Sequence, residues 1–430
     1  MSEPLEQFPT SIQIIEPGDP PSSASASSSP APALPHWQAS SEDPDSKSFR
    51  PRSLSHHLHP SHPAPSRWWL RAQATFWRTL MSCSMFLHDW APPRPPVPAF
   101  TRSISTEYDR PRSPPILLFF YVPPDYFTRS RDGHRYPVVI NFHGGGFSLG
   151  NATDDRYWAN VVLQKVDAVV VSVDYRRAPE FPFPTPVDDS VDAVLYLAAH
   201  AEELGLDPTK VALSGFSAGA NLAFTVPLRL NFHTRKGLMS NEDLNLPRWP
   251  STQKLMESAT NLKIVNIVAF YPLLDWSLSR DSKRRTSRKP EKTLPKFFAD
   301  LFDYSYLPPP DTMLHASPFV SPGLAPDNML TEGLPHDIQI FLCEWDMLLK
   351  EGEIFARRLE RLGKNIIATL VPEVVHGWDK HPDPWRDQKA IDAFYAKACD
   401  GLRESFGIEG GDKGDKEEDS YDEEKQSGSA

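Results

Sequence analysis

The feature that most restricts the fold of this chain is a series of short apolar runs separated by stretches with helical periodicity. Two of the runs read VVI at 138–140 and VVVSV at 169–173, almost without polar residues. Strands of this composition are buried on both faces, as in a parallel sheet that carries helices on each side. The alternation of such strands with helices therefore predicts an α/β fold with a mostly parallel central sheet.

The expected elements follow one another from residue 101 onward. Strands are predicted over Thr101–Thr106, Ile116–Val122, Val138–Phe142, Ala168–Val173, Val211–Ser214, Ile264–Tyr271, Ile338–Cys343 and Ile366–Val371. Helices are predicted over Asp154–Val166, Val187–Leu204, Ser217–Leu230, Leu348–Leu362 and Asp387–Leu402. Pro227 is expected to kink or end the third helix. The first two strands come before the alternation begins, so we expect them to enter the sheet antiparallel.

Both ends of the chain and two insertions do not fit the alternation. Segment 1–66 is rich in Ser and Pro and is expected to be disordered. The same holds for the tail 409–430, whose nine acidic residues and three lysines supply about half of the net charge of −11. The folded domain is expected over 67–408, with about 67–98 and 231–335 forming a cap at the carboxyl ends of the strands. A basic run within the cap, KRRTSRK at 283–289, is expected to be a solvated loop.

Charge and cysteine content restrict the compartment and the partners. Cys83, Cys343 and Cys399 are far apart, which indicates a reducing compartment and no metal cluster. The N-terminus lacks a secretory signal, so a cytoplasmic location is expected, and the mild charge of the domain indicates no nucleic-acid partner. The aromatic stretch Trp68–Trp90 leaves two interpretations open: a helix packed over the domain, or peripheral attachment to a membrane surface.

A serine between two glycines lies at a predicted junction of strand and helix. The sequence GFSAG at 215–219 follows the β-like run KVAL and precedes an apolar segment of helical length. In a turn of the G-x-S-x-G type, the serine is held at a strained backbone position at the top of the sheet. Ser217 is therefore a candidate nucleophile. It needs a base, an acid and an oxyanion site, because a serine hydroxyl is inert near neutral pH.

Candidate partners of Ser217 follow other predicted strands. The tract HGGG at 143–146 contains three consecutive glycines, which are costly to order and favour a close approach of backbone amides to an oxyanion. A phosphate loop would need Gly-Lys-Ser/Thr after the glycines, and that pattern is missing. Asp346 and His376 come just past two successive strands, in the order acid then base, at the edge where Ser217 lies. Glu344 stays open as the alternative acid.

These motifs together resemble the hormone-sensitive lipase family of α/β-hydrolases. The resemblance covers roughly residues 80–406 and rests on HGGGF at 143–147, VDYRRAPEFPFP at 173–184, GFSAGA at 215–220, WDMLLKEG at 345–352 and HGW at 376–378. It implies an α/β-hydrolase fold with a helical cap. Residue by residue, it implies Ser217 as nucleophile, Asp346 as acid, His376 as base, Gly145, Gly146 and Ala218 as oxyanion donors, and Gly144 as shaping the turn.

The chain departs from the family pattern at positions around the implied site. Phe216 stands where the family usually has an acidic residue, and Ala220 stands where it has a glycine. The run 347–350 differs from the common Pro-Leu-Arg-Asp, and Trp378 replaces a common Phe. None of these changes replaces a residue of the implied triad. Phe216 makes the surroundings of the nucleophile more apolar.

The expected function is hydrolysis of a small apolar carboxylic ester through an acyl-enzyme, without a metal or organic cofactor. An amidase or deacetylase with the same triad stays open, as do a lipase acting at a lipid surface and a non-catalytic receptor on the same fold. The substrate pocket is expected to be aromatic, lined by Tyr271, Trp276, Phe297, Phe298 and Trp378. The oligomeric state is left open by the sequence.

Overall fold

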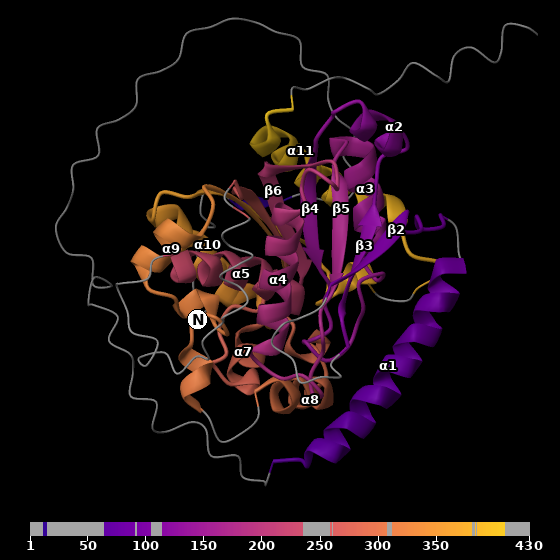
Figure 1. Ribbon diagram of the computed structural model, residues 1–430. Coiled ribbons are helices and arrows are strands. Elements are labelled where there is room, and N and C mark those ends of the chain that lie inside the picture. The colour runs from indigo at the N-terminus through magenta and orange to yellow at the C-terminus, as the bar shows by residue number, and fades with distance from the viewer. Residues whose placement is uncertain are drawn as a thin grey trace, which may run out of the picture.

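The structure is a computed structural model that describes residues 12–14, 64–90, 93–104, 114–234, 259, 261–307, 312–380, 383 and 385–408. Within these residues, a nine-stranded sheet forms the centre of the molecule, in the order β1-β9-β8-β7-β6-β4-β5-β3-β2. Helices cover both of its faces (Figure 1). The strands are β1 (Ile12–Ile14), β2 (Phe100–Ile104), β3 (Ile116–Tyr121), β4 (Tyr136–Phe142), β5 (Val169–Asp174), β6 (Leu206–Phe216), β7 (Ile264–Phe270), β8 (Asp337–Cys343) and β9 (Asn365–Val371).

The sheet confirms the predicted parallel arrangement with an antiparallel entry. β2 pairs antiparallel with β3, and β3 pairs antiparallel with β5. The remaining pairs are parallel. All residues of β4 are buried, and β5 is buried up to its last residue. Burial on both faces explains why these strands are continuous apolar runs in the sequence.

The five predicted helices are present and lie on opposite faces of the sheet. They are α3 (Arg156–Val166), α4 (Thr185–Ala199), α5 (Ala218–Thr234), α10 (Leu349–Arg361) and α11 (Gln388–Phe406). Helices α4, α5 and α10 share one hydrophobic cluster with the sheet, whereas α3 and α11 share the other. Pro227 does not end α5, because the residues on both sides of it, Val226 and Leu228, are fully buried and hold the helix in place.

One part of the N-terminal segment that was expected to be disordered belongs to the sheet. Ile12–Ile14 pairs parallel with Ala368–Leu370 of β9. Without this pairing, β9 would be an edge strand with unpaired backbone N–H and C=O groups. The β-prone Ile-Gln-Ile run provides hydrogen-bond partners for some of these groups. The expectations for 1–11, 15–63 and 409–430, and for 235–258 of the cap, lie outside the described residues.

The described cap residues form several helices, as the resemblance implies. They are α1 (Arg67–Trp90), α7 (Arg280–Thr286), α8 (Lys296–Tyr306) and α9 (Asp327–Gly333), and α2 (Tyr126–Arg131) is a short helix of the domain body. In Figure 1, α1 runs along one side of the molecule, and α7 and α8 lie at one end of the sheet. No helix in the described part of the chain is long and apolar enough to cross a membrane.

The prediction that the basic run 283–289 is a solvated loop is wrong. Most of it lies in α7, which begins after Ser279, whose hydroxyl accepts a hydrogen bond from the amide of Ser282. Lys283 is buried and forms an ion pair with Glu351 of α10. Two partners of the run are distant in sequence, Glu351 for Lys283 and Glu344 for Arg288, so the local sequence does not reveal these ion pairs.

Candidate active site

The turn between β6 and α5 holds Ser217 in an exceptional conformation. β6 ends at Phe216, α5 begins at Ala218, and Ser217 between them has φ +55°. A Cβ atom on Gly219 would lie 1.9 Å from the carbonyl oxygen of Phe142 at the end of β4. Only glycine therefore allows the helix to start this close to the neighbouring strand. The strand–turn–helix predicted from GFSAG is present.

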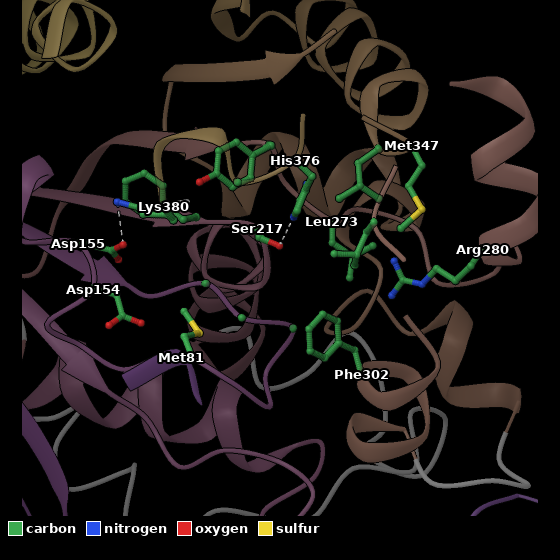
Figure 2. Close-up of a pocket in the computed structure, with 18 of the residues that line it drawn as sticks. Met81, Asp154, Asp155, Ser217, Leu273, Arg280, Phe302, Met347, His376 and Lys380 are labelled. Atoms are coloured by element: carbon green, nitrogen blue, oxygen red, sulfur yellow. Dashed lines mark hydrogen bonds and ion pairs between the residues drawn. The ribbon is translucent and has the colours of Figure 1, made fainter. Parts of the chain in front are cut away.

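Three side chains from separate strand ends form one hydrogen-bonded line, and Figure 2 shows the contact between Ser217 and His376. The Oγ atom of Ser217 lies 2.8 Å from Nε2 of His376, which follows β9. Nδ1 of the same imidazole lies 2.6 Å from Oδ2 of Asp346, which follows β8 and is buried. Because Nδ1 donates to the carboxylate, Nε2 carries the lone pair and accepts a hydrogen bond from the serine hydroxyl.

The alternative acid, Glu344, is engaged elsewhere. Its Oε1 accepts a hydrogen bond from Arg288 at 2.7 Å, and its Oε2 accepts from the amide of Glu373 at 2.8 Å. Both carboxylate oxygens thus have partners that are not the imidazole. Asp346 is the carboxylate that the fold brings to His376, and its second oxygen accepts from the amide of Leu348 at 3.0 Å.

The glycine tract after β4 turns beside the serine. Gly145 has φ +102° and Gly146 has φ +60°, and both line the same pocket as Ser217. Among the described residues, the amides of Gly145, Gly146 and Ala218 donate no hydrogen bond to a backbone carbonyl. At Ala218 this follows from its place in the first turn of α5, where amides have no acceptor within the helix. These N–H groups are available to an oxyanion.

A buried histidine supports this tract from behind. Nδ1 of His143 donates to the carbonyl oxygen of Gly144 at 2.8 Å, and the ring stacks on Tyr175 with 4.1 Å between centroids. The Tyr175 hydroxyl donates to the carbonyl oxygen of His143 at 2.8 Å. Burial lowers the pKa of His143 to about 3, which keeps the imidazole neutral. His143 therefore positions the turn and was not identified in this role from the sequence.

The pocket around Ser217 has a cavity of about 160 Å³ with an apolar and a polar side (Figure 2). The apolar side is roofed by the cap, with Phe302 of α8 over Gly146 and with Met81 and Met85 of α1. The other apolar lining residues are Leu273, Trp276, Leu294, Met347 and Leu348. At the far end, Arg280 forms an ion pair with Asp303 at 2.6 Å.

The expected aromatic lining is only partly correct. Tyr271 and Trp276 line the pocket. Phe297 and Phe298 instead pack on Trp77 of α1, with ring centroids 5.4 and 4.7 Å away. The prediction is wrong for these two residues because the rotation of α8 turns them toward α1.

Trp378 is also absent from the pocket. It packs edge-on against Phe394 of α11, at 5.6 Å between centroids. Other residues of the expected cap line the pocket and were not predicted from the sequence: Met81, Met85, Leu273, Arg280, Leu294 and Phe302. Their positions depend on how the cap helices rest on the domain.

The polar side of the pocket centres on Lys380. Its Nζ lies 3.0 Å from Oδ1 of the buried Asp155 and 3.7 Å from the ring centroid of Phe216. It also donates to the hydroxyl of Tyr395 at 3.1 Å. The aromatic residue that departs from the family pattern therefore lies beneath a cation, a favourable arrangement for a π face.

Asp154 on this side carries a strongly perturbed carboxyl group. It is buried and accepts hydrogen bonds from the amide and the side chain of Asn151, at 3.0 and 2.8 Å. Burial, together with the neighbouring Asp155, raises the pKa of Asp154 to about 7. The folded protein thus keeps this proton at a pH where the unfolded chain has released it, so raising the pH from 4 to 7 destabilises the fold through this group.

Asp154→Asn should remove this pH dependence. We expect the wild type to lose unfolding free energy relative to the variant as the pH rises from about 4 to about 7, and the loss should level off above that pH. One pKa unit corresponds to about 1.4 kcal/mol, so the relative change should amount to a few kcal/mol at most. Urea unfolding of both proteins at several pH values measures it. Parallel stability curves would contradict the assignment.

The chain is similar in sequence to known hydrolases. A family model described as an alpha/beta hydrolase fold matches residues 139–380. The carboxylesterase NlhH of Mycobacterium tuberculosis is 31% identical over 242 residues, which are 56% of this chain and 66% of that protein, just under two thirds of its length. The arylacetamide deacetylase-like 2 of Homo sapiens is 28% identical over 290 residues, which cover 59% of this chain and 70% of that protein.

A solved structure agrees with the fold over most of the chain. An esterase of Pyrobaculum calidifontis superposes with a TM-score of 0.58 at 25% identity, covering 79% of this chain and 94% of that chain. The family match at 139–380 includes the glycine tract, the turn between β6 and α5 that holds Ser217, and the segments after β8 and β9. It spans more than half of the 430 residues. The chain therefore belongs to the α/β-hydrolase fold family that this model describes, the hormone-sensitive lipase family of α/β-hydrolases.

Proposed function

We propose that the protein hydrolyses carboxylic esters through an acyl-enzyme intermediate on Ser217. The observation that carries the proposal is the continuous hydrogen-bonded line from Asp346 through His376 to a serine at φ +55°. Relatives named carboxylesterase and esterase give it independent support.

In the proposed reaction, Oγ of Ser217 attacks the ester carbonyl while Nε2 of His376 takes the hydroxyl proton. The amides of Gly145, Gly146 and Ala218 donate to the oxyanion as it forms. His376 then gives its proton to the departing alcohol oxygen, and the acyl group stays on the serine. Water releases the acyl group by the same steps in reverse, with His376 again the base. Asp346 orients the imidazole and stabilises the imidazolium.

The pocket favours a small apolar acyl or alcohol group. Leu273, Leu294 and Phe302 enclose the space beside Ser217, and the cavity of about 160 Å³ leaves little room for long chains. Polar side chains on the opposite side are already paired, as Lys380 with Asp155 at 3.0 Å shows. A neutral substrate therefore fits this pocket better than an ionic one.

We expect the highest kcat/KM for chromogenic esters with short acyl chains. It should fall by roughly tenfold or more once the chain exceeds the cavity, because overpacking costs about 1–3 kcal/mol. A series of p-nitrophenyl esters from acetate to palmitate measures this, with Ser217→Ala prepared in parallel as the control. An equal rate in the control, or no hydrolysis of any ester in the series, would overturn the proposal.

Amide hydrolysis is the second candidate. The likeness to arylacetamide deacetylase-like 2 favours it, and the same triad could protonate an amine leaving group. A matched ester and anilide with the same acyl group separate the two activities. We expect the ester to be cleaved faster. A non-catalytic receptor is disfavoured because the serine, histidine and aspartate are all present and aligned.

A further inference from the structure

Helix α1 presents two apolar faces, and the part of the chain that the structure describes covers only one of them. Leu70, Ala74 and Met85 are buried against the domain. The opposite side of the helix carries large apolar side chains whose exposed fractions run from 46% to 74%: Trp68, Trp69, Phe76, Leu80, Phe86, Leu87 and Trp90. An exposed apolar surface of this extent is unusual on a monomer and marks an interaction site.

Three of the four charged residues of α1 are bonded to the domain. Arg67 donates to the carbonyl oxygens of Tyr304 and Ser305 in α8, and Arg78 donates to the carbonyl oxygens of Ser148 and Ala178. Asp89 forms an ion pair with Arg156 of α3. These bonds fasten both ends and the middle of the helix to the domain. The helix can therefore contact a partner only through its outer face, with the helix axis parallel to the partner's surface.

The local charge indicates the chemistry of the partner. Residues 64–98 contain four arginines and one aspartate, a balance of +3 in a chain whose net charge is −11. Arg71 and Arg94 are exposed, whereas the one carboxylate of this segment is paired with Arg156. An apolar strip with tryptophans at both ends, flanked by cations and free of exposed carboxylates, matches the boundary between anionic headgroups and acyl chains.

We propose that the outer face of α1 binds the surface of an anionic phospholipid bilayer, with the helix in the plane of the headgroups. The inner face of the same helix carries Met81 and Met85, which line the pocket of Ser217. Docking therefore places α1, which covers one side of the pocket, against the lipid. An ester dissolved in the bilayer then enters the pocket from the side of α1. Delivery of substrate rests on the proposed hydrolase function, whereas the binding itself does not.

The test uses the full chain with Ser217→Ala, so that binding is measured without turnover. Flotation with vesicles of phosphatidylcholine and phosphatidylglycerol, and with phosphatidylcholine alone, gives the bound fraction. We expect binding to the anionic vesicles that weakens with salt. Phe76→Glu combined with Leu87→Glu should lower the partition coefficient by at least roughly tenfold, because two apolar side chains no longer enter the lipid.

Matched controls are Phe127→Glu and Ile354→Glu, which place the same charge on residues that are 54% and 53% exposed elsewhere. They should bind like the parent. The Phe76/Leu87 variant made on wild-type Ser217 should keep its rate on a water-soluble short ester, which shows that it is folded.

Three results would overturn the docking proposal. The first is no flotation of the parent protein with anionic vesicles, and the second is equal flotation of the Phe76/Leu87 variant. The third is a parent protein that binds no vesicles and is a dimer, which the Phe76 and Leu87 substitutions dissociate. A second copy of the chain would then cover α1. A protein that floats but cleaves no ester would instead refute the proposed hydrolase function alone.

Discussion

Ser217→Ala is expected to lower kcat for ester hydrolysis by about 10⁴-fold or more. The change removes Oγ, which lies 2.8 Å from Nε2 of His376 and would form the bond to the acyl group. The pocket and the amides of the glycine tract remain, so the variant should still bind substrate and keep a small residual rate. Steady-state kinetics on a short chromogenic ester measure the loss. Intact mass after treatment with a fluorophosphonate should show one adduct on the wild type and none on the variant.

Ser148→Ala is the matched control. This change removes another buried hydroxyl close to the glycine tract, one that has no hydrogen-bond partner among the described residues. We expect this variant to keep both labelling and turnover. Adduct formation that persists in Ser217→Ala would remove Ser217 from its role as nucleophile, whatever the kinetics show.

The central sheet was predictable from sequence because its strands must be apolar on both faces. The expected strand Val138–Phe142 lies within β4, which begins two residues earlier. β6 begins five residues before the expected Val211, because polar residues hide the pattern where the pairing of β4 with β6 shifts register. Backbone pairing continues through such an irregularity although the side-chain pattern does not.

The cap was less predictable because its contacts are made between helices distant in sequence. In α8, Phe297 and Phe298 face Trp77 of α1, while Phe302 lies over Gly146. All three are phenylalanines on one short helix, so only the docking of α8 against α1 decides which one enters the pocket. The order of Ser217, Asp346 and His376 needed no such information, since parallel strands bring their carboxyl ends to one edge.

Asp346→Asn is expected to lower kcat by about 10⁴-fold while leaving the fold and KM nearly unchanged. Oδ1 of Asp346 accepts from the amide of Leu348 at 3.0 Å, so the asparagine oxygen should keep that position. Its NH₂ group then faces Nδ1 of His376, where Oδ2 now lies at 2.6 Å. Nδ1 must become an acceptor, which moves the ring proton to Nε2. In that tautomer the imidazole cannot take the proton of Ser217.

Two carboxylates, Glu344 and Asp346, follow β8, so the first provides a matched control for the second. Glu344→Gln makes the same chemical change two residues earlier, where the carboxylate contacts Arg288 and the amide of Glu373. We expect it to change kcat only slightly, because neither contact involves the imidazole. Thermal unfolding of both variants separates a loss of catalysis from a loss of structure. A large loss in Glu344→Gln, together with near-normal turnover in Asp346→Asn, would transfer the orienting role to Glu344 and require a different arrangement of β8 and β9 at the active edge.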